Sequence, residues 1–548
     1  DRRNAAMPAR VSHALSRLLR PLVALADSRP KATALVLGLA SATGFAPLGL
    51  WPLTLLALAL LILQLAAAAD QRRAFALGWA FGVGHFALGL NWIATAFTYQ
   101  AAMPAWLGWV AVLLLSLYLA VYPGLASWAA WLAARRFPAA GLVTLALTFA
   151  ATWIVTEWLR SWVFTGFAWN PLAVMAIEVA DPAPYVGTYG LSGLVIVAAA
   201  GIARALRWFA GPRPPARPAS ARGNSAFLLF ALLLFPAMIF LGRAPDPPRA
   251  QSEGPRVTIV QPNVGQQDKW VGDKADANFA KLARLTTSAD PAPRLILWPE
   301  AAIPDYLEFG YPPIYYDRSP AQARARLAAL MNPRDAMLLG ALKLEMDAAG
   351  EVVGARNAVM LVRPEGTLGP RYDKAHLVPY GEYLPMRPLL SAIGLSRLAP
   401  GDLDFWPGPG PRSIDTGGFG LAGIQICYEI IFSGQVVDRA NRPAFIFNPS
   451  NDAWFGAWGP PQHLAQARLR AIEEGLPVVR STPTGISAII DARGHITAAL
   501  PMGQAGRIDA RLPPPLPPTL FARHGNGLGL AFAALLFAFA IALARWRR

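Results

Sequence analysis

The sequence predicts an α-helical integral membrane domain joined to a layered α/β domain outside the membrane. Hydrophobic residues make up 54% of the 548 residues and charged residues only 15%, whereas soluble globular proteins carry about 25% charged residues. Eight apolar runs are long enough to be candidates for membrane-spanning helices. Between the last two runs, short β-rich segments alternate with helical segments, which is typical of an α/β domain.

A membrane-spanning helix needs about 20 residues to cross about 30 Å of hydrocarbon, and eight apolar runs approach or exceed this length. They cover approximately 32–48, 50–69, 74–98, 105–134, 138–160, 185–208, 226–242 and 526–544. We do not expect the first run to be a cleaved signal peptide, because further runs follow it without a clear small-residue cleavage site. The chain does not open with Met, which leaves open whether residues 1–6 are native.

Lys and Arg concentrate in alternate loops between these runs. The basic segments are 1–31, Arg72–Arg73, Arg135–Arg136 and 204–222. The intervening loops carry Arg160 alone. By the positive-inside rule, both termini are predicted to be cytoplasmic and the segment 253–512 to lie outside. The net charge of +16 is therefore explained by topology, and since no basic helix or stacked aromatic motif occurs, we expect no nucleic-acid partner.

These patterns divide the chain into four predicted parts. They are a cytoplasmic tail at 1–31, a seven-helix transmembrane domain at 32–245, an outer α/β domain at 253–512, and an eighth transmembrane helix with a cytoplasmic C-terminus at 524–548. In the α/β domain, β-rich runs are expected at 257–264, 295–298, 337–339, 358–362, 421–427, 445–448 and 486–491. Helices are expected at 321–331 and 463–474.

Three reactive side chains stand at or near the ends of expected strands, where ligand crevices form in α/β folds. Glu300 follows the apolar run 295–298, Lys374 lies in a polar segment, and Cys427 ends another apolar run. Taken singly, they could be a surface carboxylate, a solvated amine and a buried thiol. Cys427 is the sole cysteine, so no intramolecular disulfide can form. The six His are scattered without metal-binding spacing, and we expect no metal site.

The local sequences around these side chains form a specific set of motifs. They are Trp298-Pro299-Glu300, the segment 374–383 (KAHLVPYGEY), Cys427-Tyr428-Glu429, the segment 448–455 (NPSNDAWF), Gln462-His463-Leu464, Arg468, 470–473 (RAIE) and 484–487 (TGIS). In them the chain resembles the apolipoprotein N-acyltransferases, the membrane-anchored branch of the nitrilase superfamily. The resemblance covers nearly the whole chain and implies a nitrilase-like αββα sandwich for 253–512. Pro483 and Tyr380 depart from the family pattern.

The resemblance also implies roles for individual residues. Cys427 would be the nucleophile, Glu300 the general base and Lys374 the electrostatic partner. A thiol attacks poorly until a base removes its proton, and a nearby ammonium favours the thiolate. The supporting residues implied are Glu382 and Glu429, which would orient the charged groups, Tyr428, whose backbone N–H would serve the oxyanion, and Trp270 and Asn357, which would line the substrate entrance.

The reaction that the resemblance implies is a two-step acyl transfer that needs no cofactor. Cys427 would take an acyl chain from a phospholipid, with phosphatidylethanolamine as the expected donor. The acceptor would be the α-amine of diacylglyceryl-cysteine on an apolipoprotein, in the last step of lipoprotein maturation at the bacterial inner membrane. The apolar segment Pro385–Pro400 is predicted to be a lid that dips into the membrane, unless its Leu residues pack a core.

The sequence leaves open two other functions and one other catalytic mechanism. A membrane-anchored amidase or nitrilase would use water as the acceptor. A transporter with a sensing outer domain is disfavoured, because the spans carry few charges and no repeated halves are visible. His376 and His463 leave room for a Cys–His mechanism, although Glu300 and Lys374 fit the chemistry without it.

Overall fold

The computed structural model describes residues 28–99, 103–137, 141–210, 233, 254–269, 271–392, 394 and 403–546. The chain divides into two compact units. One unit contains Asp1–Asn91, Val110–Pro245 and His524–Arg548, and the other contains Trp92–Trp109 and Asp246–Arg523.

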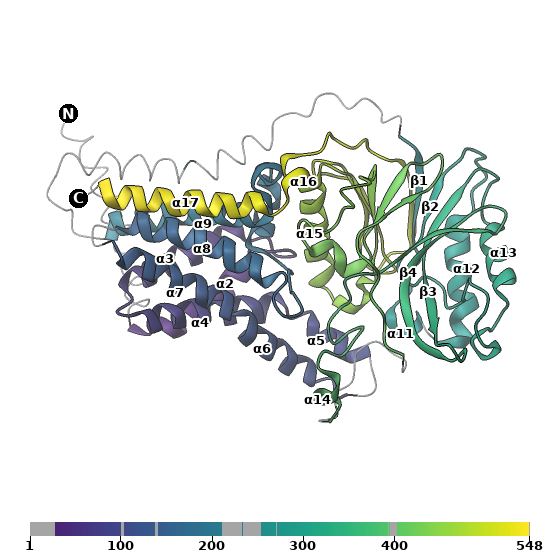
Figure 1. The fold of residues 1–548 in the computed structure, drawn as a ribbon, viewed down its shortest axis with the longest axis horizontal. Coiled ribbons are helices and arrows are strands. Elements are labelled where there is room, and N and C mark those ends of the chain that lie inside the picture. Colours follow the sequence, from purple (N-terminus) through teal and green to yellow (C-terminus); the bar gives the residue numbers. More distant parts are fainter. Residues whose placement is uncertain are drawn as a thin grey trace, which may run out of the picture. The chain divides into compact units, whose positions relative to one another are not determined.

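The first unit is built from apolar helices, which Figure 1 shows lying alongside one another. They are α2 (Pro30–Ala42), α3 (Trp51–Ala67), α4 (Gln71–Gly89), α6 (Leu107–Leu119), α7 (Val121–Arg135), α8 (Leu142–Arg160), the 3₁₀ segment η2 (Leu172–Val179), α9 (Ala183–Ala210) and α17 (Gly527–Trp546). The C-terminal α17 packs against α8 and α9, so the end of the chain completes a bundle begun at its start.

Four helical segments in the described part of the chain are long and apolar enough to cross a membrane. They are Leu107–Arg135, Leu142–Arg160, Ala183–Trp208 and Gly527–Arg545. A fifth crossing is possible where α4 continues into Ile93–Tyr99 through a bend of 49°. α2, with 13 residues, and α3, with 17 residues, fall short of the usual span of about 20 residues. The predicted run 226–242 lies outside the described residues.

Close helix packing in this unit depends on glycine. A Cβ added to Gly38 of α2 would lie 1.9 Å from the Phe81 carbonyl oxygen of α4, and one added to Gly84 of α4 would lie 2.1 Å from the Leu35 carbonyl oxygen. Small residues that let two backbones approach are typical of helix contacts inside membranes, where lipid removes the usual hydrophobic drive for association. Substitution of either glycine would therefore separate α2 from α4.

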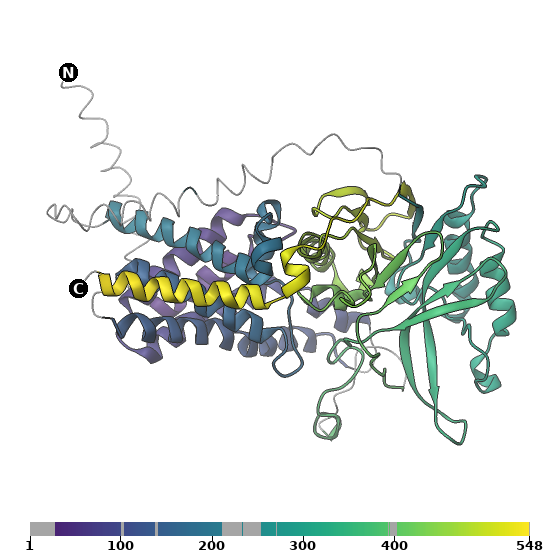
Figure 2. The same cartoon turned by 45° about the horizontal axis from the view of Figure 1, so that its top comes forward.

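The second unit contains two six-stranded sheets (Figure 2). The first has the order β12-β1-β2-β3-β4-β5 and the second the order β11-β10-β9-β8-β7-β6. The strands of the first sheet are β1 (Arg256–Gln261), β2 (Leu295–Leu297), β3 (Ala336–Met346), β4 (Val352–Val362), β5 (Leu368–Asp373) and β12 (Gly506–Arg511). Those of the second are β6 (Ser413–Asp415), β7 (Leu421–Ile424), β8 (Phe445–Pro449), β9 (Val478–Ser481), β10 (Ser487–Ile490) and β11 (Ile496–Leu500).

Each sheet has three parallel strands at its centre and antiparallel strands outside them. β1, β2 and β3 are parallel in the first sheet, and β7, β8 and β9 in the second. Buried residues from α12 (Ala275–Thr286) and α13 (Pro320–Ala328) pack on the first sheet, and α15 (Gly459–Glu474) contacts β9 of the second. Ser481 joins the two sheets, because its hydroxyl donates to the Val260 carbonyl oxygen at 3.0 Å. The unit is an α/β sandwich of two mixed sheets, which is the architecture that the resemblance implies.

A short segment outside 246–523 also belongs to this second unit. Residues 92–99, which form α5 (Ile93–Ala96) and the 3₁₀ turn η1 (Phe97–Tyr99), contact the 3₁₀ turn η6 (Asp452–Phe455). The rings of Trp92 and Phe455 meet edge to face, with centroids 4.7 Å apart. Because η6 directly follows Asn451, this contact supports the loop that reaches the candidate site.

Candidate active site

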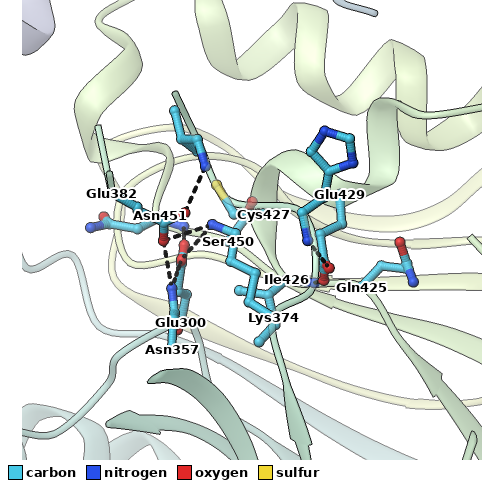
Figure 3. Close-up of polar contacts among 12 residues, drawn as sticks. Glu300, Asn357, Lys374, Glu382, Gln425, Ile426, Cys427, Glu429, Ser450 and Asn451 are labelled. Carbon is cyan, nitrogen blue, oxygen red and sulfur yellow. Dashed lines mark hydrogen bonds and ion pairs between the residues drawn. The ribbon is translucent and has the colours of Figure 1, made fainter. Parts of the chain in front are cut away.

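The three side chains singled out in the sequence come together in one buried cluster (Figure 3). Glu300 lies three residues after β2, Lys374 directly follows β5, and Cys427 lies three residues after β7. β2 and β5 belong to the first sheet and β7 to the second. The cluster therefore lies where strand ends from both sheets meet.

Glu300 is fixed through both carboxylate oxygens. Its Oε1 accepts a hydrogen bond from Asn357 Nδ2 at 2.6 Å and lies 3.5 Å from Lys374 Nζ. Its Oε2 accepts from the Asn451 backbone N–H at 2.7 Å. Hydrogen bonds of this kind to both oxygens hold a carboxylate in one orientation and stabilise its charge. Glu300 is thus held in one orientation inside the cluster.

Lys374 is almost completely buried, with an exposed fraction of 1%, and lies between two carboxylates. Its Nζ donates to Glu382 Oε1 at 2.9 Å, while Glu382 Oε2 accepts from the Val378 N–H at 2.8 Å. Asn357 Nδ2 also donates to Glu382 Oε1, at 3.1 Å, so one amide bridges Glu300 and Glu382. Burial alone would lower the pKa of Lys374, but Glu382 and Glu300 outweigh it and raise that pKa above its usual value.

Cys427 begins the 3₁₀ turn η5 (Cys427–Ile431) with a positive φ of 49°, so the expected strand 421–427 ends at Ile424. Its carbonyl oxygen is paired with His463 Nε2 at 3.0 Å, and its thiol hydrogen-bonds with Ser450. Burial and the charge of Glu300 raise the pKa of the Cys427 thiol, while the Lys374 ammonium opposes them. The resting residue is therefore a neutral thiol, and a neutral thiol attacks poorly until a base removes its proton.

Glu429 ties the lysine segment to the cysteine turn. Its Oε1 accepts from the Tyr372 hydroxyl at 2.8 Å and from the backbone N–H groups of Ala375 and His376 at 2.8 and 3.0 Å. Its Oε2 accepts from the Ile426 N–H at 2.7 Å. Burial raises the pKa of Glu429 to about 7, and these N–H donors act in the opposite direction. Glu429 thus positions backbone on both sides of the cluster.

Comparison with known proteins gives the family. Residues 37–201 match the model of the apolipoprotein N-acyltransferase N-terminal domain, and residues 256–516 match the carbon-nitrogen hydrolase model. An apolipoprotein N-acyltransferase of Bradyrhizobium diazoefficiens is 33% identical over 94% of this chain and 94% of its own. One of Caulobacter vibrioides is 36% identical with the same coverage. The chain belongs to the apolipoprotein N-acyltransferase family.

Saccharomyces cerevisiae Nit3, a member of branch 10 of the nitrilase superfamily, is among the matching solved structures. It aligns with 48% of this chain and 93% of its own at 20% identity and a TM-score of 0.34.

Two other residues expected in the site by resemblance to this family also lie in or beside the cluster. Asn357, expected at a substrate entrance, is buried and bridges the two carboxylates. The Tyr428 ring packs against Phe432, with centroids 5.1 Å apart, directly after the nucleophile candidate. Trp270 lies outside the described residues. Of the predicted lid, α14 (Arg387–Ala392) is described, and its Leu389 is exposed.

For the Cys–His alternative, His463 lies close to Cys427, but the hydrogen bond between the two residues is made by the Cys427 backbone carbonyl and not by the thiol. His463 Nε2 pairs with the Cys427 carbonyl oxygen, and its Nδ1 lies 2.9 Å from Asp452 Oδ1. Arg480 Nη2 in turn donates to Asp452 Oδ2 at 2.9 Å. Burial and the positive charge of Arg480 lower the pKa of His463. This arrangement supports the turn that carries Cys427 and favours Glu300 as the base.

Sequence reasoning missed two residues of the cluster, Asn451 and Lys269. Asn451 lies in the motif 448–455 without a predicted role, and its backbone N–H donates to Glu300 Oε2. Lys269 Nζ donates to the Glu300 carbonyl oxygen at 2.9 Å. Neither contact has a periodic signal in the sequence, because both depend on how distant loops meet. Within the described ranges, no three His, Cys, Asp or Glu side chains are grouped as ligands for a metal ion.

Proposed function

We propose that this chain transfers an acyl chain from a phospholipid to the α-amine of diacylglyceryl-cysteine on apolipoproteins, through a thioester on Cys427. The observation that supports it most is that, in a member of this family, the sole cysteine shares a buried cluster with Glu300 and Lys374. Phosphatidylethanolamine is the donor we expect. Glu300, Lys374 and Cys427 are the catalytic residues of this proposal.

The first half-reaction forms the thioester. Glu300 takes the thiol proton while the sulfur attacks the ester carbonyl carbon of the phospholipid. The tetrahedral oxyanion is stabilised by the Lys374 ammonium and the Tyr428 backbone N–H. When the intermediate collapses, the C–O bond to the glycerol breaks. The proton on Glu300 passes to the leaving alkoxide, which departs as a lysophospholipid.

The second half-reaction passes the acyl chain to the amine. The nitrogen attacks the thioester carbonyl, and Glu300 takes one amine proton. The C–S bond breaks, the sulfur receives that proton from Glu300, and the product is an amide. Glu382, Glu429 and Asn357 position the charged groups throughout. Trp270 is assigned to the substrate entrance on the resemblance alone.

Both substrates are lipids of the bilayer, which gives a reason for the membrane helices. We assign eight transmembrane spans to residues 32–245 and 524–548, and the α/β segment 253–512 to the periplasmic side of a bacterial inner membrane. Residues 385–400 would act as an apolar lid on the bilayer surface. The exposed Met386 and Leu389 support a membrane-facing role for the described part of that segment.

Mass spectrometry of the full chain in detergent tests this function. After incubation with phospholipid, Cys427 is expected to gain the mass of one acyl chain, and a diacylglyceryl lipopeptide should then remove it as an N-acylated product. Cys427→Ala and Cys427→Ser should insert into the membrane but form no thioester and show no turnover. Near wild-type acylation by the Ala variant would refute the covalent mechanism. Release of free fatty acid at an unchanged rate with and without the amine would favour a hydrolase.

A further inference from the structure

A second lysine, Lys269, reaches the active-site cluster from the short helix α11 (Gln266–Lys269), which follows β1. Its Nζ donates to the backbone carbonyl oxygen of Glu300 at 2.9 Å. The helix is itself held from outside the cluster, because Lys274 pairs with Asp268 at 2.5 Å and Asn278 Nδ2 donates to the Asp268 carbonyl oxygen at 3.0 Å. Lys269 is partly buried, whereas Lys274 is exposed.

Lys269 also connects the two sheets. With the Asn451 amide placed so that its oxygen faces donors, that oxygen accepts from Lys269 Nζ at 3.2 Å and from Trp454 Nε1 at 3.0 Å. The Asn451 backbone N–H meanwhile binds the Glu300 carboxylate. Glu300 follows β2 of the first sheet and Asn451 follows β8 of the second. Lys269 thus contacts both Glu300 and Asn451, the two residues that are joined by the hydrogen bond to the Glu300 carboxylate.

The carboxylates of the cluster outnumber the ammonium group of Lys374, so a second cation would balance the charge. The buried carboxylates of Glu300 and Glu382 face a single buried ammonium, that of Lys374. Buried charges are stable only when they are paired. Burial lowers the pKa of Lys269 to about 8, against the attraction of Glu300 and of Cys427, so the side chain is mostly protonated at neutral pH.

We propose that Lys269 is a positioning and charge-compensating residue of the active site, which holds Glu300 in place and favours the Cys427 thiolate. This inference rests on the proposed function, because it takes Cys427 as the nucleophile. Lys269 and Cys427 attract one another, and the other ionisable groups that act on the thiol are Glu300, Lys374 and Asp452. Removal of one cation from this set should raise the pH at which the thiol ionises.

The test uses the fact that Cys427 is the only cysteine, so alkylation of the full chain by iodoacetamide reports on it alone. In Lys269→Gln, the inflection in the pH dependence of alkylation should move upward by about one pH unit. The alkylation rate at pH 7 should fall by about tenfold. Lys269→Arg retains the charge and should keep the inflection within about 0.3 unit.

Lys281→Gln is the matched control, because it removes the same charge from a partly exposed lysine on α12, outside the cluster and outside α11. Its inflection should be that of the wild type. An unchanged inflection in Lys269→Gln would overturn the inference even if turnover fell, and so would an equal shift in Lys269→Arg. Acyl transfer by Cys427→Ala would instead refute the proposed function. Inactive Cys427→Ala together with unchanged alkylation in Lys269→Gln would refute only the role of Lys269.

Discussion

Cys427 adopts a backbone conformation that residues other than glycine rarely take. Its φ of 49° is of a kind that costs about 1–3 kcal/mol and persists only where the surroundings impose it. Here His463 Nε2 pairs with the Cys427 carbonyl oxygen, and Asn448 Nδ2 donates to the same oxygen at 3.4 Å and to the Gln425 carbonyl at 2.6 Å. These contacts hold the turn through its backbone carbonyl groups. The thiol itself interacts with Ser450 and with the charged side chains.

Glu300→Gln separates the charge of the base from its shape. The amide keeps the volume of the side chain but accepts no proton, so formation of acyl-Cys427 from labelled phospholipid should fall by about 10²-fold or more. Glu365→Gln, on an exposed turn, is the control and should acylate normally. Normal thioester formation in Glu300→Gln, with failure only in transfer to the amine, would mean that Glu300 acts on the acceptor and another group activates the thiol.

Lys374 can be tested by two substitutions of different severity. Arg keeps the charge, but its planar fork does not place one compact donor between Glu300 and Glu382, so acyl-Cys427 formation should be slow. Met should be slower still, because it leaves Glu300 and Glu382 without their ammonium partner and removes the oxyanion donor that we propose. Single-turnover acylation measures both. Equal rates in Lys374→Met and the wild type would exclude an electrostatic role for this residue.

At the scale of secondary-structure elements, the sequence predicts most of the strands whose ends carry the site residues. The alternation of β-rich and helical runs locates β1, β2, β3, β4, β7, β8 and β10, and it places Glu300 and Cys427 beyond strand ends. The strands β5, β6, β9, β11 and β12 have no clear pattern, since they are short or partly exposed. The contacts of Lys269 and Asn451 could not be predicted, because they exist only once the two sheets have packed together.

The end of α15 makes stability depend on pH. Glu474 is buried at the C-terminus of that helix, where a negative charge is unfavourable. Burial, followed by repulsion from Glu473, raises the pKa of Glu474 to about 7, against the attraction of Arg439. An unfolded Glu has a pKa of about 4.3. The folded state therefore binds this proton more tightly, and the stability that it contributes is lost as the pH rises from about 4 to 7.

Relative to the wild type, Glu474→Gln should accordingly raise the free energy of unfolding by more at pH 8 than at pH 5. The difference in the free energy of unfolding is expected to be on the order of 2 kcal/mol, since each pKa unit corresponds to about 1.4 kcal/mol. Thermal unfolding of the full chain in detergent at both pH values measures it, with Glu365→Gln as the exposed control. The same change in unfolding temperature at pH 5 and pH 8 would show that Glu474 does not titrate in this range.

At the scale of the whole molecule, exposed apolar side chains are a feature of the helical unit. Large apolar side chains are exposed along the helices of the first unit, including Leu113 and Leu114 of α6 and Leu535 and Phe539 of α17. Such surfaces are unfavourable in water and are suited to lipid. The α/β unit has a buried apolar core between its helices and its first sheet. The exposed apolar helices fit a unit that lies in the bilayer.

The orientation of the chain is tested by reporter fusions at Pro215 and Pro513. Short loops rich in Arg resist translocation, so the basic segment 204–222 should stay in the cytoplasm while the segment 253–512 crosses to the periplasm. Alkaline phosphatase, which is active only in the periplasm, should be active at Pro513 and inactive at Pro215. The reverse result would overturn the whole orientation. The run 226–242 is the only apolar run between Pro215 and the α/β segment, so equal activity at both sites would mean that this run does not cross the membrane.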